Sequence, residues 1–361
     1  MIQSDCMILL TPVRYGGYSF LLKEGLDHLI QNISPLFAKV YNETHHKNRY
    51  AVYPTLHVYG WMDTPDSNAE QIFNHLVGRN AINFHAKRAY STLLYSDQSD
   101  VEIAQAINNF LDGTMDHLQP KRLHPLFSTN NVAPPTKITK AVLLVGSPRK
   151  TKSTSLSLGR YLCLKLAQQS VQVDTFHLYG KKRDAEDQML LFTTICEANL
   201  VVLAFPLYVD TLPAPVLGFL EQLSGFKKTF KSDKLPYFIA FVNCGFPEAS
   251  HNENALAICS QFAQEVGFVW GGGIALGSGN GLGNKALQDW GKGTRNIRKA
   301  LDLATTALSN GQAIPKLARE IAAKPKYPAF LFRFGAQFYW KKVATMFGAK
   351  ETMHARPYLE E

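Results

Sequence analysis

The stretch KAVLLVGSPRKTKSTS, residues 140–155, decides the fold of the larger part of this chain. It opens with a short apolar run, Ala141–Val145, of the kind that forms a strand buried on both faces. Gly146 and Pro148 interrupt the run, and a Ser/Thr/Lys loop leads into a helical pattern over residues 155–169. A helix that starts directly after such a loop presents unpaired amides and the positive end of its dipole. The stretch therefore predicts a strand, an anion-binding loop and a helix.

The loop, Gly146–Leu158, supports three hypotheses. Its hydroxyls and one cation suit a monoester phosphate held largely by neutral donors: Ser147, Arg149, Ser153, Thr154 and Ser155. A second hypothesis is a Walker A loop, because Gly146–Ser153 reads G-x-x-x-x-T-K-S. Thr151 then stands where that motif has glycine, and no neighbouring strand ends in an Asp that would hold magnesium. A merely polar turn is the third hypothesis.

Working outward, apolar strand patterns alternate with helical patterns. Strands are expected at 140–146, 171–178, 200–206, 237–246 and 269–276, and helices at 155–169, 185–198, 215–224, 254–266 and 296–308. This alternation predicts an α/β fold with a doubly wound, five-stranded parallel sheet. Ligands of such sheets bind beyond the carboxyl ends of the strands, so the loops after Val145, Phe205 and Val242 are the candidate binding loops.

Two of these loops complete the candidate site. In FPLYVDTLPAP, residues 205–215, apolar and aromatic side chains are suited to lie against a planar ring. In NCGFPEASHN, residues 243–252, the Asn243 side chain and the amides of Cys244 and Gly245 are suited to a heterocycle's polar edge. A glycine loop, LGSGNGLG at 276–283, follows the fifth strand.

Taken in this order, the loops resemble the NAD(P)H-dependent FMN reductase-like family of the flavodoxin-like superfamily, over residues 140 to about 308. LLVGSPRKTKSTS resembles that family's phosphate loop, and FPLYVDTLPAPVLGFLEQL resembles its second loop. Phe205 stands where the family often has Thr, and Glu221-Gln222 replaces Asp-Arg. The resemblance implies FMN, with its phosphate on Ser147, Arg149, Ser153, Thr154 and Ser155, its ring against Pro206, Leu207, Tyr208 and Val209, and Asn243, Cys244 and Gly245 nearby.

The start of the chain carries a second copy of this second loop. LLTPVRYGGYSFLLKEGLD begins at Leu9 and has the layout of the stretch that begins at Leu203, with Pro12 aligned to Pro206 and Leu26 to Leu220. Strand patterns at 6–11, 55–62 and 89–95 alternate with helical patterns at 18–30, 67–78 and 100–111, around an insertion at 31–54. The region resembles the back half of another flavodoxin-like domain, without its first two strands and phosphate loop. We expect it not to hold FMN alone, and to pack against the complete domain or a second subunit.

Four segments follow from these patterns. They are a partial flavodoxin-like module at 1–116, a proline-containing linker at 117–138, a complete FMN-binding domain at 139–310 and a basic, aromatic, helical tail at 311–361. Residues 313–361 hold nine Lys/Arg and four Asp/Glu, which is +5 of the chain's net +9. We expect the tail to pack at a subunit or domain interface; docking on its own domain and contact with a lipid surface are the alternatives, and the lipid surface is not favoured.

Composition narrows the class of protein. A chain of 361 residues with 46% hydrophobic and 19% charged residues suits about two globular domains. The five cysteines are scattered without C-x-x-C spacing, which argues against zinc and iron–sulfur sites and fits a reducing cytoplasm. No metal site, secretory signal, membrane span or nucleic-acid partner is expected.

The function expected from the resemblance is an NAD(P)H-dependent FMN oxidoreductase in the cytoplasm. It would pass hydride from NAD(P)H to FMN and then electrons to a small-molecule or protein acceptor, and we expect a homo-oligomer. The alternatives are an electron-carrier flavodoxin and a flavin-free scaffold. Carrier flavodoxins are usually small and acidic, whereas this chain is basic and has an extra module. No acid–base residue is assigned, and Cys244 is expected to be a buried apolar side chain.

Overall fold

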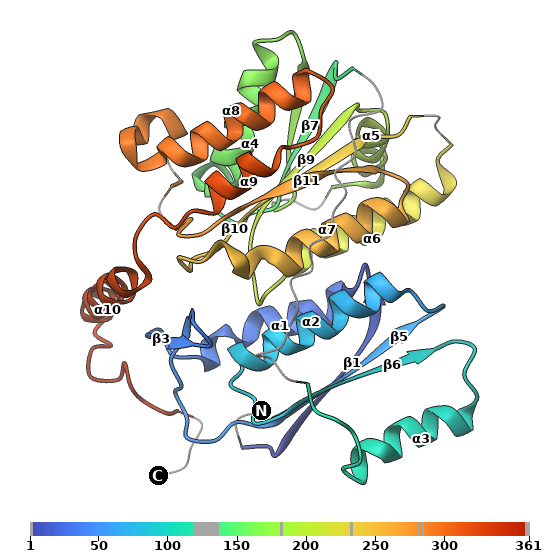
Figure 1. Cartoon of the computed structure of the whole chain (residues 1–361), viewed down its shortest axis with the longest axis vertical. Coiled ribbons are helices and arrows are strands. Elements are labelled where there is room, and N and C mark those ends of the chain that lie inside the picture. The colour runs from blue at the N-terminus through green and yellow to red at the C-terminus, as the bar shows by residue number, and fades with distance from the viewer. Residues whose placement is uncertain are drawn as a thin grey trace. The chain divides into compact units, whose positions relative to one another are not determined.

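A computed structural model describes residues 3–118, 137–180, 183–231, 234–280, 282–283 and 285–357. The chain divides into two compact units (Figure 1). The N-terminal unit comprises Met1–Leu126 and Tyr327–Glu361, and the central unit comprises Phe127–Lys326. Most of the expected linker, residues 119–136, lies outside the described residues.

The central unit is built on one five-stranded sheet. Its strands are β7 (Lys140–Val145), β8 (Gln172–His177), β9 (Leu200–Pro206), β10 (Tyr237–Asn243) and β11 (Val269–Leu276). They lie in the order β11-β10-β9-β7-β8, and every neighbouring pair is parallel. Counted along the chain this order is 2-1-3-4-5, with the switch point between β7 and β9. The predicted doubly wound α/β sheet is therefore confirmed.

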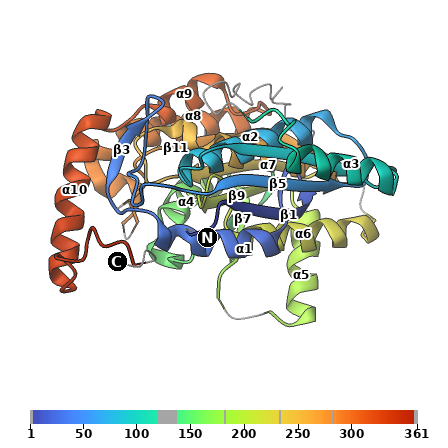
Figure 2. The same ribbon diagram turned by 90° about the horizontal axis from the view of Figure 1, so that it is seen from below.

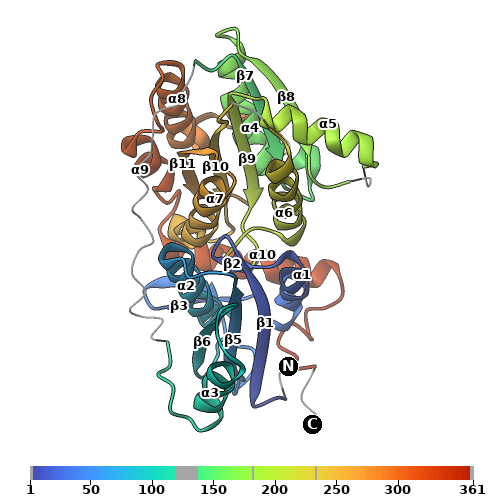
Figure 3. The same ribbon diagram turned by 90° about the vertical axis from the view of Figure 1, so that its right-hand side faces the viewer.

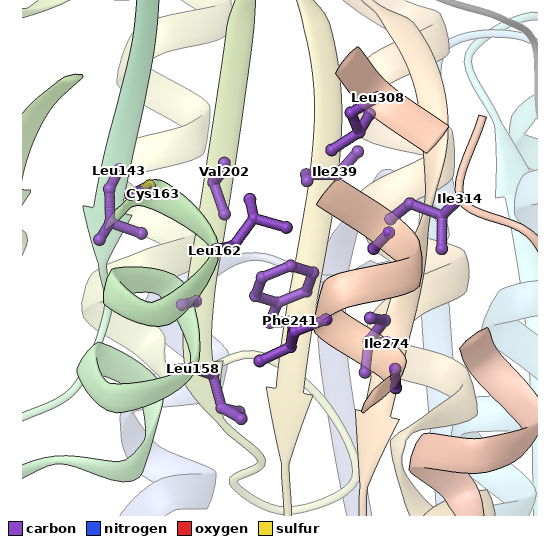
Figure 4. Close-up of a cluster of buried hydrophobic side chains, with 14 of the residues drawn as sticks. Leu143, Leu158, Leu162, Cys163, Val202, Ile239, Phe241, Ile274, Leu308 and Ile314 are labelled. Carbon is purple, nitrogen blue, oxygen red and sulfur yellow. The ribbon is translucent and has the colours of Figure 1, made fainter. Parts of the chain in front are cut away.

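Helices cover both faces of this sheet. They are α4 (Thr154–Ala167), α5 (Ala185–Cys196), α6 (Ala214–Thr229), α7 (Glu253–Glu265), α8 (Arg295–Ser309) and α9 (Lys316–Ala323), with short 3₁₀ segments at η3 (Lys150–Lys152), η4 (Ala249–Asn252) and η5 (Leu287–Thr294). Figure 3 shows α6 and α7 in front of the strands. On the opposite face, Leu158 and Leu162 of α4 and Leu308 of α8 pack on Val202 and Phe241 (Figure 4). Because the strands are buried on both faces, they are continuous apolar runs.

The N-terminal unit has three parallel strands, β1 (Cys6–Arg14), β5 (Thr55–Met62) and β6 (Ala89–Tyr95), in that order. A two-residue strand, β2 (Gly17–Tyr18), pairs antiparallel with the end of β1. Its helices are α1 (Phe20–His28), continued by the 3₁₀ segment η1 (Leu29–Asn32), α2 (Ser67–Asn83) and α3 (Asp100–Leu111). Asp66 caps α2, and Ser99 forms a capping box with Glu102 at α3. The expected three-stranded partial module is thus present ahead of the complete sheet.

The same turn follows the first strand of this unit and the third strand of the central unit. Arg14 pairs with Gly17 around Tyr15 and Gly16, whose φ angles are 58° and 75°. The equivalent stretch 194 residues later, Tyr208–Thr211, forms an antiparallel bridge around Val209 and Asp210, whose φ angles are 43° and 60°. Both are two-residue turns in the left-handed region. This agreement supports the internal repeat that the sequence predicts.

The insertion at 31–54 forms a hairpin that the sequence analysis did not predict. Its strands are β3 (Phe37–Val40) and β4 (Glu43–His46). The basic tail contributes α10 (Ala329–Met346), which lies beside β3 (Figures 1 and 2). Among the residues that the structure describes, no helix combines the length and the apolar character needed to span a membrane.

Candidate functional site

A cavity lies beyond the carboxyl ends of β7, β9 and β10, where the strand order reverses. Its walls come from four loops: Ser147, Arg149, Ser153, Thr154, Ser155, Pro206, Leu207, Tyr208, Asn243, Gly245, Gly279 and Asn280. All of the predicted site residues except Val209 and Cys244 line it. Gly279 and Asn280 also line the cavity and were not predicted as site residues, although they belong to the glycine loop after the fifth strand.

The phosphate loop, residues 146–155, turns from β7 into α4. After the 3₁₀ segment η3, Ser153 is the N-cap of α4, and its Oγ accepts a hydrogen bond of 3.1 Å from the Leu156 amide. The same hydroxyl donates to the Lys150 carbonyl at 2.7 Å. Lys150 has a φ of 46°, so the loop holds a left-handed residue at its tip. Ser153 therefore shapes the loop and starts the helix.

Two hydroxyls of the same loop fasten the neighbouring loops to it. Thr154 Oγ1 donates to the Gly279 carbonyl at 2.6 Å, and Ser155 Oγ donates to Asn243 Oδ1 at 2.9 Å. Both bonds are buried. Since these hydroxyl protons are already engaged, Thr154 and Ser155 act as positioning groups, and the Asn243 side chain is fixed in place by Ser155.

The donors left to face the cavity are Ser147, Arg149 and the start of α4. Within the described part of the chain, the Ser147 hydroxyl and the Arg149 guanidinium donate to no protein acceptor, while Ser147 Oγ accepts from the Arg149 amide at 3.4 Å. The first amides of a helix have no partner inside it. These groups have the chemistry of an anion site, and anion binding here stays a prediction.

The second wall is a rigid turn. The Leu207 amide donates to the Asn243 carbonyl at 2.8 Å, which ties this loop to β10. The Tyr208 and Thr211 amides and carbonyls bond each other at 2.9 and 3.0 Å. Val209, at the first central position, is β-branched, and a φ of 43° is unfavourable for such a residue. Val209 shapes the turn that presents Pro206, Leu207 and Tyr208, and does not itself line the cavity.

The third loop differs from the expectation at Cys244. Its amide donates to the Leu276 carbonyl at 3.0 Å and is not available to a heterocycle. Its Sγ lies within 3.5 Å of the Phe246 and Glu248 carbonyls and of Asn252 Nδ2. Burial raises the pKa of this thiol to about 12. Cys244 is thus a buried packing residue behind the site, which leaves Asn243 and Gly245 on the cavity wall.

The glycine loop at 277–283 packs tightly on the other loops. The Gly279 amide donates to the Cys244 carbonyl at 2.9 Å, and a Cβ at Gly279 would lie 2.9 Å from the Asn243 Cβ. A Cβ at Gly283 would lie 2.0 Å from the Lys152 carbonyl oxygen. Gly283 needs glycine because two backbone segments approach closely, and Gly279 because the Asn243 side chain lies against it. The LGSGNGLG pattern was the available sequence signal for this contact.

The lining residues favour an anionic ligand. They include the Arg149 cation and no Asp or Glu. Lys152, the lysine that a Walker A loop would use, does not line the cavity. The site therefore fits the monoester-phosphate hypothesis better than the Walker A hypothesis.

Comparison with known proteins finds a fold family that matches part of the central unit. Residues 139–242 match the family described as having a flavodoxin-like fold, which confirms the resemblance at that level. No curated protein matches the chain.

Similar solved structures share little sequence with this chain. An azoreductase from Bacillus anthracis is 15% identical over 48% of this chain and 100% of its own, with a TM-score of 0.34. An NAD(P)H:quinone oxidoreductase from Methanothermobacter marburgensis is 15% identical over 48% and 96%, with a TM-score of 0.37. A flavodoxin from Streptococcus pneumonia TIGR4 is 16% identical over 38% and 83%, with a TM-score of 0.28.

Proposed function

We propose that the central unit binds FMN in this cavity and that the protein is an NAD(P)H-dependent oxidoreductase. The observation that carries the proposal is the convergence of an anion-binding helix start with an apolar wall at the switch point of the sheet. We assign the FMN site to the central unit, whose phosphate loop follows β7.

The phosphate is assigned to the donors that have no protein acceptor among the described residues. Ser147 and the first amides of α4 donate to its oxygens, and Arg149 adds a positive charge at the cavity mouth. The other three hydroxyls support the site indirectly. Ser153 holds α4, Thr154 holds Gly279 and Ser155 holds Asn243 in place. The loop is thus organised before the ligand arrives, which lowers the entropy cost of binding.

The ring is assigned to the wall formed by Pro206, Leu207 and Tyr208. Tyr208 is partly exposed, so one side of this wall is open to a second reactant. FMN supplies the redox chemistry when bound, accepting hydride from NAD(P)H and passing electrons to an acceptor. The protein's contribution is to hold the ring against a stiff turn and to present Asn243 and Gly245 to its polar edge. No side chain is assigned an acid–base role.

The first test is the visible spectrum of the purified protein. We expect an oxidised-flavin spectrum, or its appearance on titration with FMN, and release of FMN on denaturation. Consumption of NADH or NADPH with a quinone or azo dye as acceptor is then the assay for the enzyme, with Arg149→Gln as the variant expected to lose FMN affinity.

Three outcomes separate the alternatives. FMN binding with NAD(P)H oxidation supports the proposal. FMN binding without NAD(P)H oxidation overturns the assignment of an NAD(P)H-dependent enzyme and favours an electron carrier. A colourless protein that does not take up FMN overturns the cofactor assignment and leaves a flavin-free scaffold.

A further inference from the structure

The tail helix α10 leaves most of its surface in water. None of its residues, Ala329–Met346, is buried. One side of α10 contacts β3 of the N-terminal unit (Figure 2). At this contact, Phe332 lies 5.6 Å from Phe37, ring centre to ring centre. On the opposite side, large apolar side chains are exposed among the residues that the structure describes.

These side chains form a continuous stripe. Phe330, Leu331, Phe334 and Phe338 are 62%, 49%, 62% and 60% exposed. Phe334 and Phe338 follow Phe330 by four and eight residues, and Leu331 precedes Phe334 by three. This spacing places the four side chains on one face of the helix. The Phe334 and Phe338 rings are 4.8 Å apart in a T-shaped pair. We call these four residues the phenylalanine stripe. An exposed apolar surface of this kind marks an interaction site.

The charged residues on α10 and next to it in the sequence are all of one sign. Between Glu320 and Glu351 the sequence has no acidic residue and six basic ones: Lys324, Lys326, Arg333, Lys341, Lys342 and Lys350. Lys341 and Lys342 follow Phe338 by three and four residues, so they flank the C-terminal end of the stripe, and both are exposed. Aromatic side chains bordered by cations are typical of helices that lie in the surface of an anionic bilayer.

We propose that α10 binds the surface of anionic lipid membranes. The phenylalanine stripe enters the headgroup region, and Lys341 and Lys342 contact lipid phosphates. A second copy of the chain fits this surface less well, because it would bring another +9 chain against the same basic helix. The length and polarity of α10 suit a helix lying parallel to the membrane and not across it.

Vesicle binding of the full-length protein tests the proposal. Co-sedimentation is measured with phosphatidylcholine vesicles and with an equal mixture of phosphatidylcholine and phosphatidylglycerol, at low and high salt. We expect binding to the mixture alone, weakened by salt. F334S/F338S should lower the partition coefficient roughly 100-fold, and K341Q/K342Q about twentyfold.

Matched controls make the same kinds of substitution at exposed positions outside α10. M189S/L190S removes two exposed apolar side chains from α5, and K292Q/K299Q removes two exposed lysines from the central unit. Both should bind vesicles as the wild type does, and circular dichroism establishes that every variant is folded. The proposal is overturned if the wild type does not bind the anionic vesicles, or if the controls and the α10 variants lose binding equally. It is also overturned if F334S/F338S converts a dimer to a monomer without changing lipid binding.

Discussion

Two serines of the phosphate loop line the same cavity but use their hydroxyls differently. Ser147 faces the cavity as a donor, whereas Ser153 caps α4 through the Leu156 amide. Ser147→Ala should weaken FMN binding about 10- to 100-fold, since it removes a hydrogen bond to a charged group, and leave stability unchanged. Ser153→Ala should instead lower the free energy of unfolding by about 1 kcal/mol through loss of the cap.

Fluorescence titration of FMN and urea unfolding measure these two effects on the same preparations. A Ser153→Ala protein of normal stability but poor affinity would mean that Ser153 contacts the phosphate directly. A Ser147→Ala protein with unaltered affinity would remove Ser147 from the binding site.

A second residue-scale prediction concerns the buried His57 of β5. Its Nε2 lies 2.8 Å from Thr92 Oγ1, its ring packs against Tyr59 and Phe110, and burial lowers its pKa from 6.5 to about 4. Between these two pH values the unfolded chain binds more protons than the folded one. Acidification from pH 6.5 to 4 should therefore cost up to roughly 3 kcal/mol of stability through this residue, and the loss should be absent above pH 6.5.

His57→Phe isolates this contribution, because it retains an aromatic ring and removes the titrating group. Urea unfolding followed by circular dichroism across the pH range gives the slope of stability against pH. The variant should show a clearly smaller slope than the wild type over this window. Equal slopes would show that the acid sensitivity comes from other groups.

At the scale of elements, replacing two helical glycines by alanine should change the stability of the protein in opposite directions. A Cβ at Gly159 of α4 would lie 2.4 Å from Leu143 Cδ1 in the buried core, whereas Gly225 of α6 has nothing within 4 Å. Gly225→Ala should stabilise the protein by about 1 kcal/mol through helix propensity. Gly159→Ala should destabilise it by about 1–3 kcal/mol, because overpacking outweighs the same propensity gain.

Urea unfolding of both variants and of the wild type measures the direction in which each substitution changes the free energy of unfolding. Stabilisation by Gly159→Ala would mean that α4 is packed less closely on β7 than the structure shows. Destabilisation by Gly225→Ala would place a neighbour over that part of α6.

Elements with strong local signals were predictable from the sequence. The strands of the central sheet are buried on both faces, so their apolar runs mark them closely, as at Leu200–Pro206. The hairpin β3–β4 was missed because its turn residues, Tyr41 and Asn42, have positive φ angles without the glycine that usually signals such a turn. α9 lies in the tail that was expected to be helical, but its bounds were not predicted because only eight residues, Lys316–Ala323, carry its pattern.

The sequence was sufficient to predict which loops form the candidate site, but not what each residue in those loops does. The order of the loops indicates which residues meet at the switch point. The partners of Thr154 and Ser155, however, are Gly279 and Asn243, which lie 125 and 88 residues further along the chain. No local pattern encodes those bonds. The bond between the Cys244 amide and the Leu276 carbonyl, which removes that amide from the site, depends in the same way on tertiary contacts.

At the scale of the whole molecule, the partial module leaves one sheet edge open. The central unit pairs β9 with β7, but in the described residues no strand pairs with the outer edge of Cys6–Pro12 in β1. Ile8 and Leu10 of this strand are 50% and 71% exposed. Such an edge is prone to association, and the expected homo-oligomer stays a prediction that light scattering can test.

The five free cysteines allow the two units to be followed separately. Cys6 lies in the N-terminal unit and is only partly buried, whereas the other four are buried in the central unit: Cys163, Cys196, Cys244 and Cys259. Burial raises the pKa of all five thiols, to about 12 for Cys163 and about 11 for Cys196. Only the thiolate reacts with iodoacetamide, so both accessibility and ionisation protect the central unit.

Mass spectrometry after brief alkylation should therefore find Cys6 modified in the native protein and the other four unmodified. In increasing urea the four buried thiols should become reactive together, because they report unfolding of one cooperative sheet. Rapid labelling of Cys244 alone, without Cys163 and Cys259, would show instead that the third loop opens independently of the sheet. If FMN then suppressed that labelling, the opening would belong to the binding site; if it did not, the loop would open away from the bound ring.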